Sequence, residues 1–262
     1  MDVLVFDIET IPDLALAKRL YDWPSMSDQE AQSALDAKLL AEKGSTFAPL
    51  HLHKIVAISL VMRRGPDLRC WSLGDLESSE ADLISRFYKG LERFSPRLIS
   101  WNGAGFDLPV LHYRALKNKV QAAHYWETGE QRADFRYNNY LNRYHQRHTD
   151  LMDVLALYQG RGNARLDQVA LMLGYPGKMG MDGSKVAEAV AGGHLHKVRQ
   201  YCETDVLNTY LVYLRFQLMT GQLTTAQLEI EEDKVKAFLD EQGQVGGQRH
   251  FQEFLEQWLH AA

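Results

Sequence analysis

The first ten residues constrain this chain more than any other stretch. Residues 3–10 read Val-Leu-Val-Phe-Asp-Ile-Glu-Thr, and the apolar, β-branched run that begins there is typical of a buried strand. Strand side chains alternate between the two faces of a sheet, so Asp7 and Glu9 point to the same side, one step apart. We expect Pro12 to end the strand, because proline cannot donate a hydrogen bond to a neighbouring strand.

Two like charges held together at the end of a buried strand are unfavourable unless something compensates them. Asp7 and Glu9 either share a proton or bind a metal ion. A solvated edge strand would also tolerate them, but its flanks should then be polar, and the flanks here are apolar. The stretch by itself therefore favours metal binding.

The bulk composition narrows the class of protein. A chain of 262 residues with no strong internal boundary predicts a single domain, with a core over about residues 1–220 and a helical extension over residues 221–262. The formal net charge of −5 means that any nucleic-acid binding must come from a local patch. Two cysteines, no apparent signal peptide and no apolar run of about 20 residues predict a cytoplasmic protein.

The order of predicted elements indicates an α/β fold. A charged segment over residues 13–44 reads as a helical insertion, in which a capping box at residues 27–30 opens a helix. Two strands around a turn at residues 63–67 form a hairpin, so the sheet is mixed rather than wholly parallel. The remaining predicted elements are a helix at 78–94, a strand at 97–101, helices starting at 107 and 150, helices at 166–173, 185–190 and 195–219, and two more between 224 and 260.

A third acidic residue follows the strand at residues 97–101. Ligand sites in open α/β sheets lie at the carboxyl ends of strands, so Asp107 is a candidate partner for the first two acids. The competing interpretation is that Asp107 only caps the helix that begins there, with Pro109 in its first turn.

The long helix over residues 195–219 carries a fourth candidate acid. Tyr201 and Asp205 lie four residues apart, on one face and beside the apolar stripe through Cys202 and Val206. A carboxylate that points inward at this position needs a partner. The alternatives are ordinary core packing for the tyrosine and an exposed helix charge for the aspartate.

Taken together, these residues form a more specific pattern than any of them alone. The chain resembles the DEDD exonuclease superfamily, which has a ribonuclease H-like fold, and within it the Tyr-type, stand-alone 3′-5′ exonucleases related to the proofreading domain of family B DNA polymerases. Three motifs carry this resemblance, over about residues 1–220: Phe6-Asp7-Ile8-Glu9-Thr10, Asn102-Gly103-Ala104-Gly105-Phe106-Asp107, and Tyr201-Cys202-Glu203-Thr204-Asp205.

The resemblance implies a ribonuclease H-like mixed sheet flanked by helices, with extra C-terminal helices, and a metal-dependent mechanism. The implied ligands of two divalent ions are Asp7, Glu9, Asp107 and Asp205. All-oxygen ligands suit Mg²⁺ or Mn²⁺, and two such ions clamp an in-line displacement at phosphorus. Tyr201 would orient the attacking water, since an ordinary pKa of about 10 makes it a poor general base.

The implied substrate is single-stranded nucleic acid with a free 3′ end, with DNA favoured and any replication or repair partner unknown. Thr10 and Ile11 lie beside the predicted metals and are expected to touch the terminal nucleotide. The second motif adds two substrate-binding candidates, Asn102 and Phe106, although a core role for the phenylalanine is an equal alternative. Lys185, in a glycine-rich loop together with Lys178, is a candidate contact for the scissile phosphate.

Residues 110–165 are locally basic and aromatic, with nine Lys or Arg against five Asp or Glu. Such a stretch fits single-strand binding, in which aromatic rings stack on bases and cations follow the phosphates. A solvated helix face is the alternative. Asp150 reads as a helix N-cap and is a candidate for a supporting role near the metals. The cationic candidates are Arg114, Lys117, Arg132, Arg136, Arg143, Arg147, Arg161 and Arg165.

Two other classes of protein share part of this pattern. A haloacid dehalogenase-type phosphatase also begins with a strand that ends in Asp, but its mechanism needs a second Asp two residues on, where this chain has Glu9. A non-catalytic nucleic-acid-binding protein on a nuclease fold would be expected to have lost some of the acids. All four are present, together with Tyr201, which favours the exonuclease.

Overall fold

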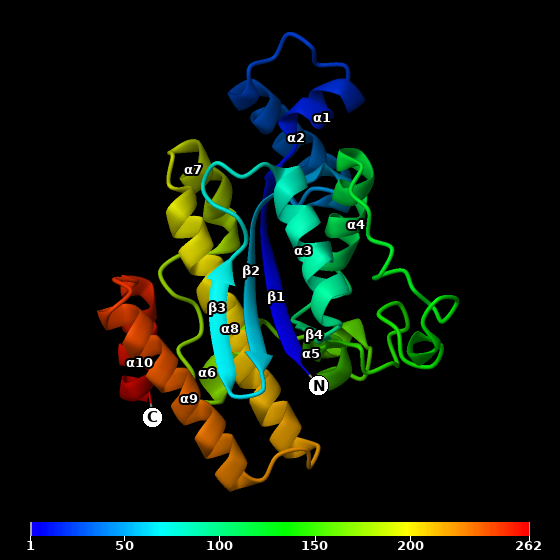
Figure 1. Cartoon of the computed structure of the whole chain (residues 1–262). Coiled ribbons are helices and arrows are strands. Elements are labelled where there is room, and N and C mark those ends of the chain that lie inside the picture. The colour runs from blue at the N-terminus through cyan, green and yellow to red at the C-terminus, as the bar shows by residue number, and fades with distance from the viewer. Residues whose placement is uncertain (1, 262) are drawn as a thin grey trace.

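A five-stranded mixed sheet forms the centre of the computed structural model, which describes residues 2–261 (Figure 1). The strand order is β3-β2-β1-β4-β5; β2 runs antiparallel to both β1 and β3, and β4 is parallel to both β1 and β5. This arrangement confirms the predicted mixed α/β sheet. The strands are β1 (Val3–Pro12), β2 (His53–Arg64), β3 (Asp67–Ser72), β4 (Arg97–Ser100) and β5 (His148–Asp150).

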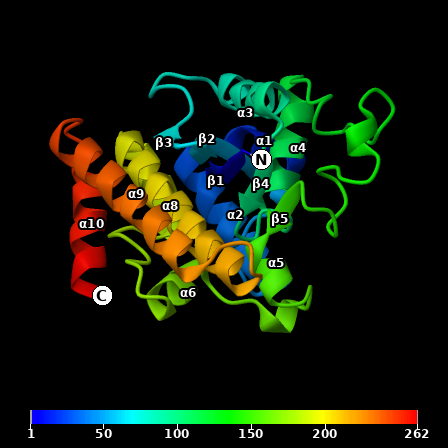
Figure 2. The same ribbon diagram turned by 60° about the horizontal axis from the view of Figure 1, so that its bottom comes forward.

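Helices cover both faces of the sheet. Figure 2 shows α3 and α4 on one side, and α8, α9 and α10 together on the other. The helices are α1 (Leu14–Leu20), α2 (Asp28–Lys43), α3 (Glu80–Phe94), α4 (Asp107–Asn118), α5 (Leu151–Leu155), α6 (Leu166–Met172), α7 (Val186–Ala191), α8 (Leu195–Met219), α9 (Thr225–Gln244) and α10 (Arg249–Ala261). Short 3₁₀ turns occur at residues 50–52, 133–135, 160–162 and 183–185.

The central strand β1 divides the core into two hydrophobic clusters. Leu4, Phe6 and Ile8 face α3 and α4, whereas Val5 packs among the side chains of α8. This alternation is the period-two pattern expected of a strand buried on both faces. Asp7 and Glu9 lie on the same face of β1 as Val5, so both carboxylates are directed toward α8.

The local signals of the sequence set most of the element boundaries. Helix α2 begins with the predicted capping box, in which the Ser27 hydroxyl accepts from the Glu30 amide and the Glu30 carboxylate accepts from the Ser27 amide. Strand β1 ends at Pro12 as predicted. Strand β5 was not predicted, because its three residues, His-Thr-Asp, carry no apolar run; only pairing with β4 makes it a strand.

The two C-terminal helices complete the core on the α8 side of the sheet. Leu228 and Val235 of α9, and Phe251 and Trp258 of α10, belong to the same hydrophobic cluster as Val5 of β1. Within the part of the chain that is described, no helix has both the length and the apolar character needed to cross a membrane.

Candidate active site

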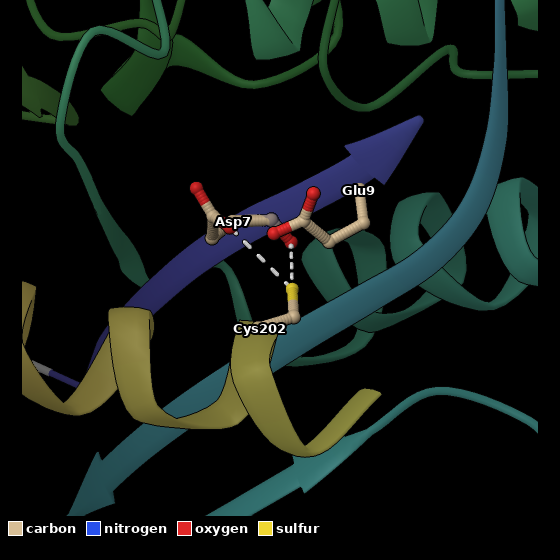
Figure 3. A group of neighbouring side chains, drawn as sticks. All are labelled: Asp7, Glu9 and Cys202. Carbon is tan, nitrogen blue, oxygen red and sulfur yellow. Dashed lines mark hydrogen bonds between the residues drawn. The ribbon is translucent and has the colours of Figure 1, made fainter. Parts of the chain in front are cut away.

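The acidic pair of β1 lies against the middle of α8. The Cys202 thiol donates to a carboxylate oxygen of Asp7 at 3.4 Å and approaches the backbone oxygen of the same residue at 3.5 Å. Figure 3 shows this thiol rising from α8 toward Asp7 and Glu9, whose carboxylates lie on one side of the strand. The alternation predicted from the sequence therefore holds at the acids, and it places them at the contact between sheet and helix.

Asp107 belongs to this site and does not cap its helix. The N-cap position of α4 is Phe106, which makes no capping hydrogen bond, and Asp107 is the first helical residue. Its buried carboxylate accepts a hydrogen bond of 3.1 Å from the backbone amide of Ile8, between the two acids of β1. The N-cap alternative is thus wrong, and the hydrogen bond connects the start of α4 to the acidic strand.

Asp150 stabilises the loop that precedes Asp107. Its carboxylate caps α5, as the sequence suggested, and also accepts from the amides of Asn102 and Ala104 at 2.9 and 2.8 Å. The loop turns tightly, with Asn102 at a φ of +63°, and a Cβ at Gly103 would overlap the side chain of Ser100. Asp150 therefore acts through the backbone that precedes Asp107.

Helix α8 brings Tyr201 and Asp205 to the same place. Burial raises the pKa of Tyr201, and the charges of Asp205 and Glu9 raise it further. The nearby Tyr201 hydroxyl in turn lowers the pKa of the Asp205 carboxyl. The tyrosine thus faces the acids from α8, one helical turn from Asp205, and its hydroxyl stays protonated at neutral pH.

Asp7, Glu9, Asp107 and Asp205 form what we call the acidic cluster. Burial raises the pKa of Asp7 well above its ordinary value, and the charges of the other three members raise it further. Burial likewise raises the pKa of Glu9. The pKa of Asp107 rises to about 7 and that of Asp205 to about 6, in both cases chiefly through burial. The four carboxyl groups repel one another in a region that water reaches poorly.

The chemistry of the cluster fits divalent cations. Four converging carboxylates supply only hard oxygen donors, the ligand type that Mg²⁺ and Mn²⁺ prefer. The neighbouring Cys202 does not alter this choice, because burial raises the pKa of its thiol well above the usual value and the proton is shared with Asp7. Cations held among these groups would remove the repulsion that raises their pKa values.

Lys178 lies beside the cluster. The charge of Lys178 lowers the pKa of both Glu9 and Asp205, and its side chain lines the cleft that leads to them. Lys185, predicted as a substrate contact, is exposed at the end of a 3₁₀ turn and lies near Asp182 on the rim of the cleft. Lys178 therefore lies nearer to the acidic cluster than Lys185 does, and the phosphate contact of Lys185 stays a prediction.

A cleft of about 1180 Å³ opens onto the acidic cluster. Of the predicted substrate contacts, Thr10, Asn102 and Phe106 line it. Ile11 instead packs against Ala57 and its neighbours on the α7 side. Residues that the sequence analysis did not select also line the cleft, among them Phe47, His53, Trp101 and Asp167. No local pattern marks them, since they come from a loop, from two strand ends and from the first turn of α6.

His53 orients the Thr10 hydroxyl. The His53 Nε2 lies 3.0 Å from the backbone oxygen of Ala48, which can only accept, so Nε2 carries the proton. Burial lowers the pKa of His53, which keeps the ring neutral. Nδ1 then accepts from the Thr10 hydroxyl at 2.8 Å. Because the hydroxyl proton of Thr10 is used in this hydrogen bond, the hydroxyl can only accept hydrogen bonds from a molecule in the cleft.

Phe106 forms part of an aromatic wall. Its ring meets His53 edge-on at a centroid distance of 5.0 Å and lies 5.7 Å from the ring of Phe47. Phe47 is largely exposed. The side chain of Phe106 thus packs on the core and also lines the cleft, and its contact with a terminal base stays a prediction.

Part of the predicted basic and aromatic surface is internal structure. Arg114 is 1 % exposed and bonds to Asp13 and Glu80, which excludes it as a phosphate contact. Arg147 is buried and stacks over Phe135 at 3.8 Å. The helical pattern at residues 107–118 gives no sign that Arg114 is buried, since arginine is usually exposed. Arg165, by contrast, lines the cleft.

Comparison with known proteins identifies the family of this chain. Residues 45–258 match the family described as a predicted 3′-5′ exonuclease related to the exonuclease domain of PolB. The chain belongs to this family. The matched part contains Asp107, Tyr201 and Asp205, and it reaches through most of α10, beyond the limit of about residue 220 that the motifs suggested. Strand β1 precedes it, so the assignment of Asp7 and Glu9 depends on the geometry described above.

Two relatives of this exonuclease-related chain are DNA polymerases. A DNA polymerase from Pyrococcus glycovorans is 32% identical over 124 residues, which are 45% of this chain and 15% of the polymerase. The structure of the family B DNA polymerase from Pyrobaculum calidifontis superposes with a TM-score of 0.51 at 18% identity, covering 84% of this chain and 24% of the polymerase. This chain thus corresponds to a small part of each polymerase, and the structural likeness shows a shared fold.

Proposed function

We propose that this protein is a metal-dependent 3′-5′ exonuclease that removes nucleotides from the 3′ end of single-stranded nucleic acid, with DNA favoured. It would be a stand-alone enzyme of the Tyr type. The observation that carries the proposal is the convergence of four carboxylates from β1, α4 and α8, two buried and two partly buried, whose pKa values are raised. Family membership supports a nuclease, and the open cleft supports access by a chain end.

The acidic cluster would hold two divalent cations, Mg²⁺ or Mn²⁺. When bound, they supply Lewis acidity and positive charge at the scissile phosphate. The hydrogen bond from the Ile8 amide fixes Asp107 against β1, and the Cys202 thiol fixes Asp7 against α8. The chain thereby orders the carboxylates before any cation arrives, which limits the reorganisation that binding requires.

The other residues of the site bind and orient the substrate. Tyr201 keeps its proton, so its hydroxyl positions the attacking water by hydrogen bonding rather than acting as a base. Lys178 neutralises charge on the phosphate beside Glu9 and Asp205. Phe106 and Phe47 offer ring faces to the terminal base, and Thr10 accepts a hydrogen bond from the terminal nucleotide. Asn102 borders the same part of the cleft.

A labelled-oligonucleotide assay tests this function directly. A single-stranded 20-mer with a 5′ label should yield a ladder of shortened products with Mg²⁺ or Mn²⁺ and none with EDTA. A 3′-phosphate on the same oligonucleotide should slow the reaction. Asp7→Asn should abolish the ladder, whereas Asp233→Asn, on the exposed face of α9, should not. Tight, metal-insensitive binding without cleavage on DNA or RNA would instead identify a non-catalytic binding protein.

A further inference from the structure

A second groove lies on the α3 face of the sheet, whereas Asp7 and Glu9 of the acidic cluster are directed toward α8 on the other face. It has a volume of about 520 Å³ and is bordered by α3 on one side and by β2 and β3 on the other. In Figure 1, α3 lies in front of the sheet beside β1, and among the described elements no helix crosses β2 or β3 on that side. Strand β3 is also the edge of the sheet. The groove shares no lining residue with the cleft.

The floor of this groove is apolar and its rim is cationic. Leu60, Met62, Leu73, Phe87 and Phe94 supply side chains to the floor, and Trp71 of β3 is 36% exposed beside them. The rim carries five cations from β2, β3 and α3, against a single lining acid, Asp67: these are Arg64, Arg69, Arg86, Lys89 and Arg93.

Two of the five rim cations form ion pairs among the described residues, and Arg93 also lies over the Phe94 ring. Arg86 pairs with Asp82 on its own helix, and Arg64 pairs with Asp2. Arg69, Lys89 and Arg93 form no ion pair with any carboxylate among the described residues. This concentration of positive charge contrasts with the net charge of −5 of the whole chain. Tryptophan and arginine are also the residues that most often dominate the energy of protein interfaces.

Gly90 points independently to a ligand. It lies inside α3 and lines the groove, although glycine destabilises a helix interior relative to alanine. The backbone does not require it there, because its φ is not positive and an added Cβ would meet no atom within 4 Å. A side chain at position 90 would project into the groove. The glycine keeps that space open beside the apolar floor.

We propose that the groove between α3 and the β2–β3 hairpin binds an acidic peptide segment of a partner protein through apolar anchor side chains. The floor selects apolar side chains, because burying them there removes apolar surface from water. The cationic rim selects acidic residues that flank these anchors and excludes basic ones. A phosphodiester backbone fits the rim but leaves the apolar floor without a partner. Because the groove and the cleft share no lining residue, the partner leaves the cleft free.

Peptide selection tests the proposal and does not require the partner to be identified. A random 12-residue display library is selected on the wild-type protein and, in parallel, on Gly90→Leu, whose side chain fills the groove while favouring the helix. Wild type should enrich sequences that combine Asp or Glu with Leu, Phe or Trp, and Gly90→Leu should not. Equal enrichment on both proteins, or enrichment of basic sequences, would overturn the proposal.

The enriched peptide is then labelled and titrated by fluorescence anisotropy. Gly90→Leu and Arg69→Glu should each weaken its binding at least tenfold, while Gly90→Ala and the distant charge reversal Lys43→Glu change it less than threefold. Cleavage of the 20-mer oligonucleotide should be unchanged in every variant. Displacement of the peptide by a 20-residue oligothymidylate, lost in Arg69→Glu, would show a nucleic-acid surface and contradict the peptide site.

Discussion

Two groups of buried or partly buried carboxylates gather around the carboxyl-terminal half of β1 and the turn that follows it, and they differ in how their charge is compensated. Directly after the strand, Asp13 bonds to Arg114 and Lys117, and Glu80 bonds to the same arginine, at distances of 2.6 and 2.7 Å. Burial raises the pKa of Asp13, but the hydrogen bonds from Lys117 and Arg114 outweigh it and bring the pKa to about 2.

The acidic cluster, a few residues earlier on the same strand, lacks this compensation. Its members keep raised pKa values, and Lys178 is the cation whose charge lowers the pKa of two of them. The group of Asp13 and Glu80 connects the helical insertion at residues 13–44 to α3 and α4, and there the chain supplies its own cations. In the acidic cluster the chain supplies little positive charge, so the negative charge there is available to an exchangeable cation. The same residue type thus has a structural role in one group and a proposed catalytic role in the other.

The largest expected effect is on activity in the acidic cluster. Asp205→Asn should lower nuclease activity at least about 100-fold, since even residues behind metal ligands typically contribute 10- to 100-fold. Its unfolding temperature in EDTA should be equal to or above that of the wild type, because one repelling charge is gone. Steady-state cleavage and thermal unfolding measure the two quantities. Retained activity would remove Asp205 from the proposed catalytic set.

The compensated group should instead respond in stability. Arg114→Met leaves Asp13 and Glu80 buried without their main partner, and loss of one member of a buried pair typically destabilises by about 3–5 kcal/mol. Lys117→Met is the matched control, because Lys117 is half exposed and should contribute no more than about 1 kcal/mol. Urea unfolding of both variants gives the comparison. Equal losses would mean that burial does not distinguish the two cations.

The two groups should also respond to pH in opposite directions. An Asp whose folded pKa is about 6 or 7, as for Asp205 and Asp107, stabilises the fold below about pH 4 and loses that contribution as the pH rises to about 7. Asp13, with a pKa of about 2, stabilises the fold above about pH 4 and loses this as the pH falls.

In EDTA, the unfolding temperature should therefore fall between pH 5 and pH 8, and Mn²⁺ should restore it more at pH 8 than at pH 5. Asp205→Asn should flatten the profile in EDTA. A metal-free protein that becomes more stable across this interval would contradict the raised pKa values of the cluster.

The smallest expected effect concerns Thr10. Thr10→Val removes one hydroxyl from the cleft, and a single neutral hydrogen bond contributes about 0.5–1.5 kcal/mol, so KM should rise roughly twofold to tenfold with little change in kcat. Steady-state kinetics on the 20-mer separates the two parameters. A large fall in kcat at unchanged KM would give Thr10 a role in the chemical step instead.

Much of this architecture could be predicted from residues close together in sequence. Apolar alternation predicted β1, and capping residues predicted the start of α2. Spacing along a helix predicted that Tyr201 and Asp205 share a face. These signals are local, because they depend on the period of an element or on one turn of backbone. The three-residue strand β5 has no such signal and exists only through its pairing with β4.

What the sequence by itself determined is that acids recur at the end of a buried strand, after another strand and on one face of a long helix. Only the tertiary structure decided which of them lack a cation. Arg114 and Lys178 look alike in sequence, yet Arg114 lies inside one carboxylate group, whereas Lys178 lies at the edge of the other. Compensation of charge depends on distances between residues far apart in the chain, and folding alone sets those distances.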